Sequence, residues 1–290
     1  MKNKYFDNII VFGSSGYVGK SLKKFFYGFK EFNFLFVSRN NPEDINIDIT
    51  DPQSFNKLPI NKKTVLVLLT AVSSPDFCAK NFEYSFNINV NSTIKLIDHT
   101  LNRDGRVIFF SSDVVYGENT KILDEKSDCN PLGEYAKMKR IIEVRYFKNN
   151  NVKIIRPSYI FSSDDRFSKY LLDCSIKGQK SRIFHPLYRN IIFIEDVLNG
   201  LIKIIINWNE LTTNIINFGG NKLLSRKDIA LFYKKYLYQN LEINLENPPK
   251  DFFKARPRSI NINSSILEDL LGRETKNIES LFINKNLFLN

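Results

Sequence analysis

The chain is poor in the residues that most often bind metals or form disulfides. Its 290 residues include only three cysteines and two histidines. Cys78, Cys129 and Cys174 are an odd number without metal-like spacing, so we expect reduced thiols in a cytoplasmic protein. His99 and His185 lie far apart in the sequence, which argues against a zinc site and against a Ser-His-Asp triad. We expect both histidines to be structural and no metal to be bound.

Long apolar runs are also missing. The longest, such as residues 65–72, fall well short of the roughly 20 residues that a membrane helix needs. The charged first residues lead directly into an apolar segment, so we expect neither a signal peptide nor a membrane partner.

The net charge of +11 is not concentrated in a basic block. Lys and Arg mostly alternate with apolar residues at helical spacing, as in 22–30 and 226–235. Nucleic acid would explain such a charge, because basic side chains displace counterions from phosphates. No motif of a nucleic-acid-binding class occurs, however, so we expect no nucleic-acid partner. An acidic small ligand, such as a nucleotide sugar, suits the charge as well.

Short apolar segments alternate with helical ones, which predicts an α/β fold with a Rossmann-type, doubly wound parallel sheet. After residue 156 the alternation loosens, but no linker separates the halves. We therefore expect a dinucleotide-binding domain at 1–156 and a small α/β substrate-binding region at 157–290, interleaved with the first. The predicted strands are 8–12, 34–38, 65–70, 106–111, 152–156, 182–184, 191–194 and 215–218, and the predicted helices are 17–29, 82–101, 135–149, 195–207 and one opened by a capping box at 225–228.

A glycine-rich turn follows the first predicted strand. Gly13, Gly16 and Gly19 are each separated by two residues, unlike the GxGxxG spacing of long-chain dehydrogenases. Glycine turns also occur without a cofactor, but this one opens a βαβ unit, where backbone N–H groups can approach a pyrophosphate. The cofactor-binding residues predicted here are Gly13, Ser15, Gly16, Tyr17, Val18 and Gly19.

The end of the second predicted strand bears on cofactor choice. An acidic residue there would hold the ribose 2′-hydroxyl of NAD, but the chain has Ser38-Arg39-Asn40. Arg39 can accommodate a 2′-phosphate instead, or be an exposed loop charge. We therefore favour NADP(H), with NAD(H) possible.

Three side chains form a candidate proton-transfer set. Tyr135 and Lys139 are spaced i, i+4 and so lie on one helix face. A phenol titrates near pH 10, and a neighbouring ammonium is expected to lower that pKa. A surface tyrosine and lysine would show the same spacing. Ser112 favours the catalytic interpretation, because it follows a buried strand at the end where ligands bind in such sheets.

With these motifs the whole chain resembles the short-chain dehydrogenase/reductase superfamily, in its extended branch of NAD-dependent epimerases and dehydratases that modify nucleotide sugars. The resemblance is carried by the GSSGYVG turn, the SSDVVYG run at 111–117, Pro131 before the YxxxK pair, Arg156-Pro157 and the segment 189–197. Within that branch the chain is most similar to the dTDP-4-dehydrorhamnose reductases, by Asp48-Ile-Thr-Asp-Pro, by residues 130–135 and by Ala255-Arg256-Pro257.

The resemblance implies a role for each matching residue. Ser112, Tyr135 and Lys139 would be catalytic, and Asn89 would support the proton relay. Further cofactor contacts would come from Asp48 and Ile49 at the adenine and Ala71 at the nicotinamide ribose, and substrate contacts from Asp113, Arg189 and Arg256.

The implied activity is reduction of a nucleotide-linked 4-keto-6-deoxy sugar for polysaccharide biosynthesis, with a homodimer as a possible assembly. The chain departs from the family's usual motifs at two positions that affect cofactor and substrate contacts. It has Leu69-Thr-Ala-Val72 where the family usually has Asn-Ala-Ala-Ala, and Phe161-Ser162 where the family usually has Gly-Pro. Val114 replaces the glutamate that follows the aspartate in family dehydratases, so the elimination base is missing. The alternatives are a nucleotide-sugar epimerase and a cofactor-binding regulator without turnover; the complete Ser-Tyr-Lys set counts against the regulator.

Overall fold

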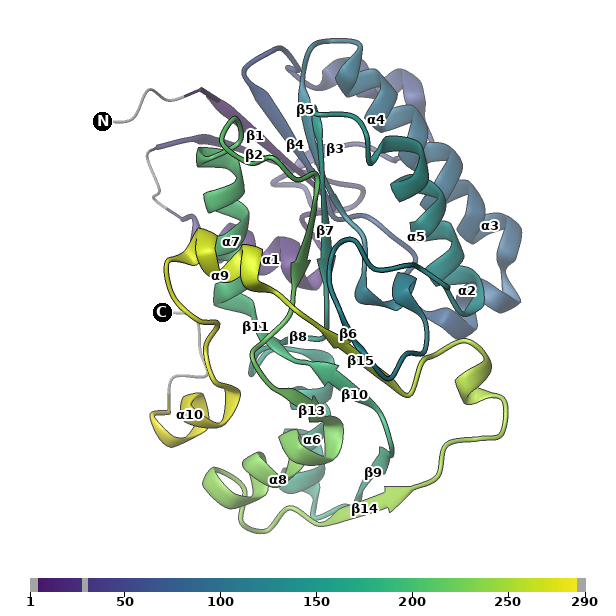
Figure 1. Ribbon diagram of the computed structural model, residues 1–290, viewed down its shortest axis with the longest axis vertical. Coiled ribbons are helices and arrows are strands. Elements are labelled where there is room, and N and C mark those ends of the chain that lie inside the picture. The colour runs from purple at the N-terminus through teal and green to yellow at the C-terminus, as the bar shows by residue number, and fades with distance from the viewer. Residues whose placement is uncertain (1–4, 28–30, 286–290) are drawn as a thin grey trace.

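The computed structural model describes residues 5–27 and 31–285. Its centre is a seven-stranded sheet in the order β12-β7-β5-β4-β1-β2-β3, in which every neighbouring pair is parallel. This confirms the predicted α/β fold (Figure 1). The strands are β1 (Asn8–Phe12), β2 (Asn33–Ser38), β3 (Ile45–Asn46), β4 (Thr64–Leu68), β5 (Arg106–Phe110), β7 (Val152–Pro157) and β12 (Ile215–Phe218).

Helices cover both faces of this sheet (Figure 1). Successive strand side chains point to opposite faces, so Ile9 and Val11 of β1 join one apolar core while Ile10 and Phe12 join the other. The first core lies against α1 (Tyr17–Phe25), α7 (Ile194–Ile206) and α9 (Ser265–Leu271); the second lies against α4 (Thr93–Leu101) and α5 (Gly133–Tyr146).

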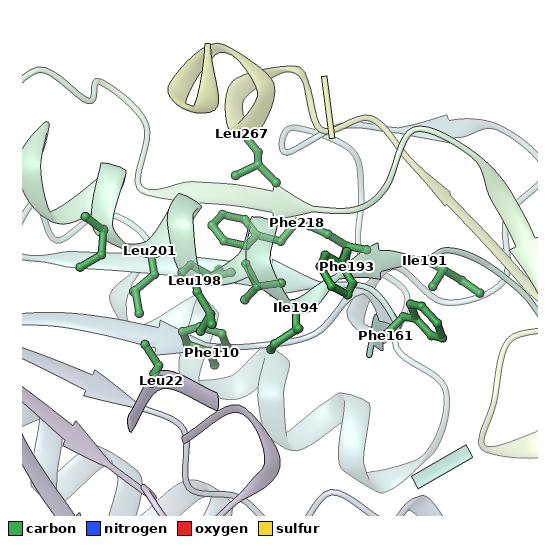
Figure 2. Close-up of a cluster of buried hydrophobic side chains, with 14 of the residues drawn as sticks. Leu22, Phe110, Phe161, Ile191, Phe193, Ile194, Leu198, Leu201, Phe218 and Leu267 are labelled. Carbon is green, nitrogen blue, oxygen red and sulfur yellow. The ribbon is translucent and has the colours of Figure 1, made fainter. Parts of the chain in front are cut away.

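Figure 2 shows how the first core joins the two halves of the chain. Leu22 of α1, Phe110 of β5, Leu198 of α7 and Leu267 of α9 all point into it. Each of these side chains is buried. None of the described helices is long and apolar enough to span a bilayer.

A smaller mixed sheet in the order β13-β10-β15-β6 lies beside the large one. Its strand β6 comes from the first half of the chain, whereas β12 of the large sheet comes from the second half, so the two halves exchange strands. The remaining elements here are β6 (Ile122–Leu123), β8 (Ile160–Phe161), α6 (Arg166–Lys177), β9 (Ser181–Phe184), β10 (Tyr188–Asn190), β11 (Ile192–Phe193), β13 (Leu223–Ser225), α8 (Arg226–Tyr236), β14 (Ile243–Glu246), β15 (Ser259–Ile262) and α10 (Ile278–Ile283).

Most predicted elements are present, but several have other bounds: α5 ends at Tyr146 rather than at residue 149, and β4 ends at Leu68 rather than at residue 70. The helix predicted at 82–101 is divided into α3 (Phe82–Phe86), a π-helical turn (Asn87–Ser92) and α4. The strand predicted at 191–194 is shorter, because β11 covers only two residues and Ile194 already begins α7. Helix α1 ends at Phe25, and the end predicted for it at residue 29 lies outside the described residues. The capping box at Ser225 and Asp228 is confirmed.

Candidate functional site

A cleft of about 840 Å³ opens at the carboxyl ends of the strands. The strand order reverses between β1 and β4, which is where α/β sheets of this kind bind ligands. The glycine turn and the ends of β4 and β5 contribute to one wall, and α5 and α6 to others. Among the predicted site residues, Gly13, Gly16, Tyr17, Val18, Gly19, Ala71, Ser112, Tyr135 and Lys139 line this cleft.

The glycine turn has a backbone that side chains would obstruct at two positions. Gly13 has a φ of +98°, and a Cβ there would lie 2.6 Å from Thr70 Oγ1. A Cβ on Gly19 would lie 2.5 Å from the Cα of Ser14, so Gly19 is needed where α1 packs against the turn. Gly16 differs: a Cβ added there would make one tight contact, with Gly13 O at 3.3 Å, and apart from its chain neighbours would have no other atom within 4 Å.

Helix α1 presents its N-terminus to the space beside Gly16. Its N-cap residue is Gly16, and no side chain caps it. The first N–H groups of a helix have no partner within the helix and favour an anion. An open, uncapped helix N-terminus next to Gly16 is the geometry that a pyrophosphate requires.

A second pocket, of about 260 Å³, continues from the first, because Gly13 and Ala71 line both. It also contains the predicted Ser15, Arg39, Asp48 and Ile49, with Tyr84 and Ile88 on its apolar side. Arg39 Nη1 lies 3.7 Å from Asp48 Oδ2, and both side chains are exposed in part. Hydrogen bonds from Thr50 hold the pKa of Asp48 below its ordinary value, with desolvation opposing them. A positive and a negative group therefore stand together in this pocket.

The main cleft is lined by Ser112, Tyr135 and Lys139. Ser112 lies just past the end of β5, and its hydroxyl accepts a hydrogen bond from Val114 N at 3.4 Å. Tyr135 and Lys139 come from the first two turns of α5, and Lys139 Nζ lies 5.9 Å from the centre of the Tyr135 ring. Lys139 is 4% exposed and donates to Phe110 O at 2.7 Å, which holds the ammonium beneath the cleft.

The expected lowering of the Tyr135 pKa is wrong for this structure. Burial is the largest cause and raises the pKa of Tyr135 well above its ordinary value, with the Cys78 thiol and the Asp113 carboxyl adding to the rise. Burial likewise lowers the pKa of Lys139 to about 8, although Glu143 opposes this. Desolvation disfavours the charged form of each group, and it is the largest cause of both shifts. The phenol is therefore set as a proton donor rather than as a phenolate.

Asn89 lies in the π-helical turn and is almost completely buried. Its Oδ1 accepts from Val72 N at 2.8 Å and its Nδ2 donates to Val72 O at 2.9 Å. Such π turns are frequent at functional sites. The structure thus places Asn89 behind the 69–72 segment of the cleft wall, and its proton-relay role stays a prediction.

The three predicted substrate residues lie outside the lining of the cleft. Asp113 is buried, accepts from Ser158 Oγ at 2.8 Å and lies 3.6 Å from Arg189 Nε; burial is the main cause that raises the Asp113 pKa. Arg189 donates to Pro257 O at 2.9 Å. Arg256 forms a bidentate pair with Asp76, at 2.8 and 2.7 Å. Their substrate contacts stay predictions.

Sequence reasoning missed the basic end of the cleft. Arg166, Arg182 and Arg226 line it together with Tyr159, Phe167, Tyr170 and Phe184. The three arginines come from α6, β9 and α8, so no local motif could have grouped them. A second omission is Asp44, whose buried carboxylate binds Ser14 Oγ at 2.5 Å and Lys23 Nζ at 3.0 Å behind the glycine turn.

These features fit a nicotinamide dinucleotide. The uncapped N-terminus of α1 and the open side of Gly16 suit the pyrophosphate, and the second pocket suits the adenosine end. Tyr135 and Lys139 then stand where the nicotinamide half would lie. Arg166, Arg182 and Arg226, with the aromatic rings beside them, lie at the other end of the cleft and are chemically suited to a diphosphate and a base.

Comparisons with known proteins agree with this geometry. Residues 9–219 match the model of the "NAD dependent epimerase/dehydratase family". N-acetyl-α-D-glucosaminyl-diphospho-ditrans,octacis-undecaprenol 4-epimerase of Escherichia coli O157:H7 is 30% identical over 188 residues, 60% of this chain. The chain spans about 55% of the length of that curated relative.

Solved structures share the fold. A hypothetical dTDP-4-dehydrorhamnose reductase from Sulfolobus tokodaii superposes with a TM-score of 0.80 at 20% identity, over 93% of this chain and 97% of the other. The UDP-glucuronic acid 4-epimerase from Bacillus cereus, solved with UDP-glucuronic acid and NAD, gives a TM-score of 0.77 at 18% identity, over 97% of this chain and 100% of the other.

Proposed function

This chain belongs to the NAD dependent epimerase/dehydratase family, and from that premise we propose that it is an NAD(P)-dependent enzyme that reduces a nucleotide-linked 4-keto-6-deoxy sugar. The observation that supports this most is that Ser112, Tyr135 and Lys139 line one cleft together with the glycine turn. One wall can hold the cofactor while the other presents a neutral phenol to the substrate.

Each of the three side chains has a distinct task in this reaction. The glycine turn would hold NAD(P)H, whose chemistry here would be donation of a hydride to the keto carbon, leaving NAD(P)⁺. Tyr135 donates its proton to the carbonyl oxygen, and its raised pKa keeps the phenol protonated until the oxygen becomes an alkoxide. Ser112 donates a hydrogen bond to the same oxygen. The Lys139 ammonium donates one hydrogen bond to Phe110 O. Its remaining N–H groups bind the ribose, and its charge stabilises the tyrosinate left by proton transfer.

The basic end of the cleft would bind the substrate's diphosphate. Arg226 lies 5.3 Å from the centre of the Phe167 ring and 5.9 Å from that of Tyr159, which fixes its guanidinium near the cleft. Arg182 is already paired with Glu246. One guanidinium group can bind two phosphate oxygens through two parallel hydrogen bonds. An aromatic ring of the cleft can stack on the nucleotide base.

A nucleotide-sugar epimerase is the second candidate, because the E. coli relative is named as a 4-epimerase. The same side chains would serve, with the hydride returned to the opposite face of the sugar. The dehydratase reaction is not proposed, because Val114 stands where an elimination base would be needed.

The deciding experiment is incubation with NADPH or NADH and a panel of dTDP-, UDP- and GDP-linked sugars, including 4-keto-6-deoxy forms. Loss of nicotinamide absorbance in proportion to product supports a reductase. Isomerised sugar without net consumption supports an epimerase. No turnover and no cofactor binding across the panel would refute both, and Tyr135→Phe is the control that separates enzyme activity from a contaminant.

A further inference from the structure

We infer that Tyr17 is a positioning residue that couples cofactor binding to substrate binding. Its hydroxyl donates a 2.8 Å hydrogen bond to Ser162 Oγ, joining the glycine turn to the turn that begins α6. Residues 17 and 162 are 145 positions apart in the chain, so this contact exists only in the folded protein. The identity of the two ligands in this inference rests on the proposed function. The contact between Tyr17 and Ser162 is independent of that function.

At one end of the bond lies the cofactor turn. Tyr17 is the first residue of α1, directly after the N-cap Gly16, and its side chain forms part of the cleft wall. A pyrophosphate held by the first N–H groups of α1 restricts the backbone of this residue. Because a tyrosine has only two side-chain torsions, a fixed backbone leaves its hydroxyl little freedom.

At the other end lies a tight turn over residues 162–165. Ser162 Oγ accepts from Asp164 N at 3.0 Å, and Ser162 N donates to Asp165 Oδ2 at 3.2 Å. Asp165 in turn caps α6 by accepting from Phe167 N at 2.7 Å and from Ser168 N at 3.1 Å. Ser162 and Asp165 are each 3% exposed. Asp164 between them is exposed, so the buried hydrogen bonds of Ser162 and Asp165 are the ones that hold the turn.

Helix α6 carries the substrate end of the cleft. Arg166, Phe167 and Tyr170 of its first two turns line the cavity, and Tyr159 donates to Asp165 Oδ1 at 2.8 Å. A cofactor that orders Tyr17 therefore favours the capped conformation of α6. The first ligand to bind loses the conformational entropy of ordering this turn. The second ligand then binds an ordered turn and loses less entropy, so the two bind cooperatively.

The phenol suits this role. Burial is the main cause that raises the pKa of Tyr17 well above its ordinary value, despite the Ser162 hydrogen bond. The group therefore remains a neutral donor throughout the pH range in which the enzyme would be assayed.

The test is a thermodynamic cycle with NADP⁺ and dTDP as the probes, repeated with UDP. Calorimetry gives the dTDP affinity with and without saturating NADP⁺ for the unmodified protein, Tyr17→Phe, Ser162→Ala and the double variant. We expect NADP⁺ to tighten dTDP or UDP binding about two- to tenfold, the worth of one neutral hydrogen bond. Each variant should lose this factor, and the double variant should lose no more than Tyr17→Phe alone.

Tyr27→Phe is the matched control, because Tyr27 lies just beyond the other end of α1 and is 93% exposed. It should retain the full coupling factor. If Tyr17→Phe retains it as well, with both ligands bound, the inference is overturned while the proposed function stands. Failure of the unmodified protein to bind either NADP⁺ or NAD⁺ would instead contradict the proposed function.

Hydrogen exchange tests the contact without any ligand. In Tyr17→Phe and in Ser162→Ala the amides of Phe167 and Ser168 should exchange faster, whereas those of α7 should not. Tyr17→Phe is the cleaner variant, since Ser162→Ala also removes the acceptor of Asp164 N. Unchanged exchange at the start of α6 in Tyr17→Phe would show that the bond does not hold α6, and would refute the inference whatever the ligands are.

Discussion

Two glycines of the same turn should respond in opposite ways to substitution. Gly16→Val should weaken cofactor binding and leave a folded protein, whereas Gly13→Ala should weaken the fold itself. The contrast follows from what a side chain would meet at each position. At Gly16 the nearest protein atom to an added Cβ is Gly13 O at 3.3 Å, and at Gly13 it is Thr70 Oγ1 at 2.6 Å.

The magnitudes follow from these distances and torsions. Gly13 has a φ of +98°, outside the range that alanine adopts readily, and forcing it there costs about 1–2 kcal/mol before the clash with Thr70 is counted. At Gly16 the backbone is ordinary, with a φ of −74° and a ψ of 173°, so the cost is that of replacing an N-cap glycine, about 1 kcal/mol. The valine side chain would occupy the space beside the N–H groups of α1. Losing one charge-assisted hydrogen bond to a phosphate costs about 1.5–3 kcal/mol, or roughly 10- to 150-fold in Kd.

The assay pairs calorimetric titration of NADPH with urea unfolding of the same preparations. We expect Gly16→Val to bind NADPH at least tenfold more weakly while its free energy of unfolding falls by no more than about 1 kcal/mol. Gly13→Ala should lose more stability than Gly16→Val. A Gly16→Val protein with the Kd of the unmodified one would show that the turn does not hold the pyrophosphate, and a fully stable Gly13→Ala would refute the strain argument.

Three further predictions concern the catalytic and specificity residues. Tyr135→Phe should lower kcat by about 10²–10⁴-fold with NADPH affinity nearly intact in calorimetry; retention of most of the activity would remove Tyr135 from proton transfer. Because burial lowers the pKa of Lys139 to about 8 and the ammonium is the active form, kcat/KM should fall as pH rises through about 8. A profile that stays flat well above that pH would contradict this. NADPH should be preferred over NADH only modestly, since Arg39 is exposed and lies 3.7 Å from Asp48. The preference should shrink in high salt and vanish in Arg39→Ala. Equal kcat/KM for both cofactors at low salt would contradict the role given to Arg39.

Local patterns in the sequence are sufficient for the cofactor turn and for six of the seven strands of the central sheet. Each of these six is a short, mostly apolar run, and β1 and β12 have the predicted bounds. The two-residue edge strand β3 was not predicted. The glycine spacing and the i, i+4 spacing of Tyr135 and Lys139 are likewise local. These features allowed the fold class and the cofactor side of the main cleft to be predicted from the sequence, but not the basic end of the cleft.

Only the tertiary structure decides which distant side chains meet and how solvent is excluded from them. Arg166, Arg182 and Arg226 gather from three elements, and Tyr17 reaches Ser162 across 145 positions. The pKa of Tyr135 shifts in the direction opposite to that expected, because the elements packed around it desolvate the phenol. Spacing along a helix is encoded by a few neighbouring residues. Desolvation of a group depends instead on every element that packs around it, and that packing exists only once the chain is folded.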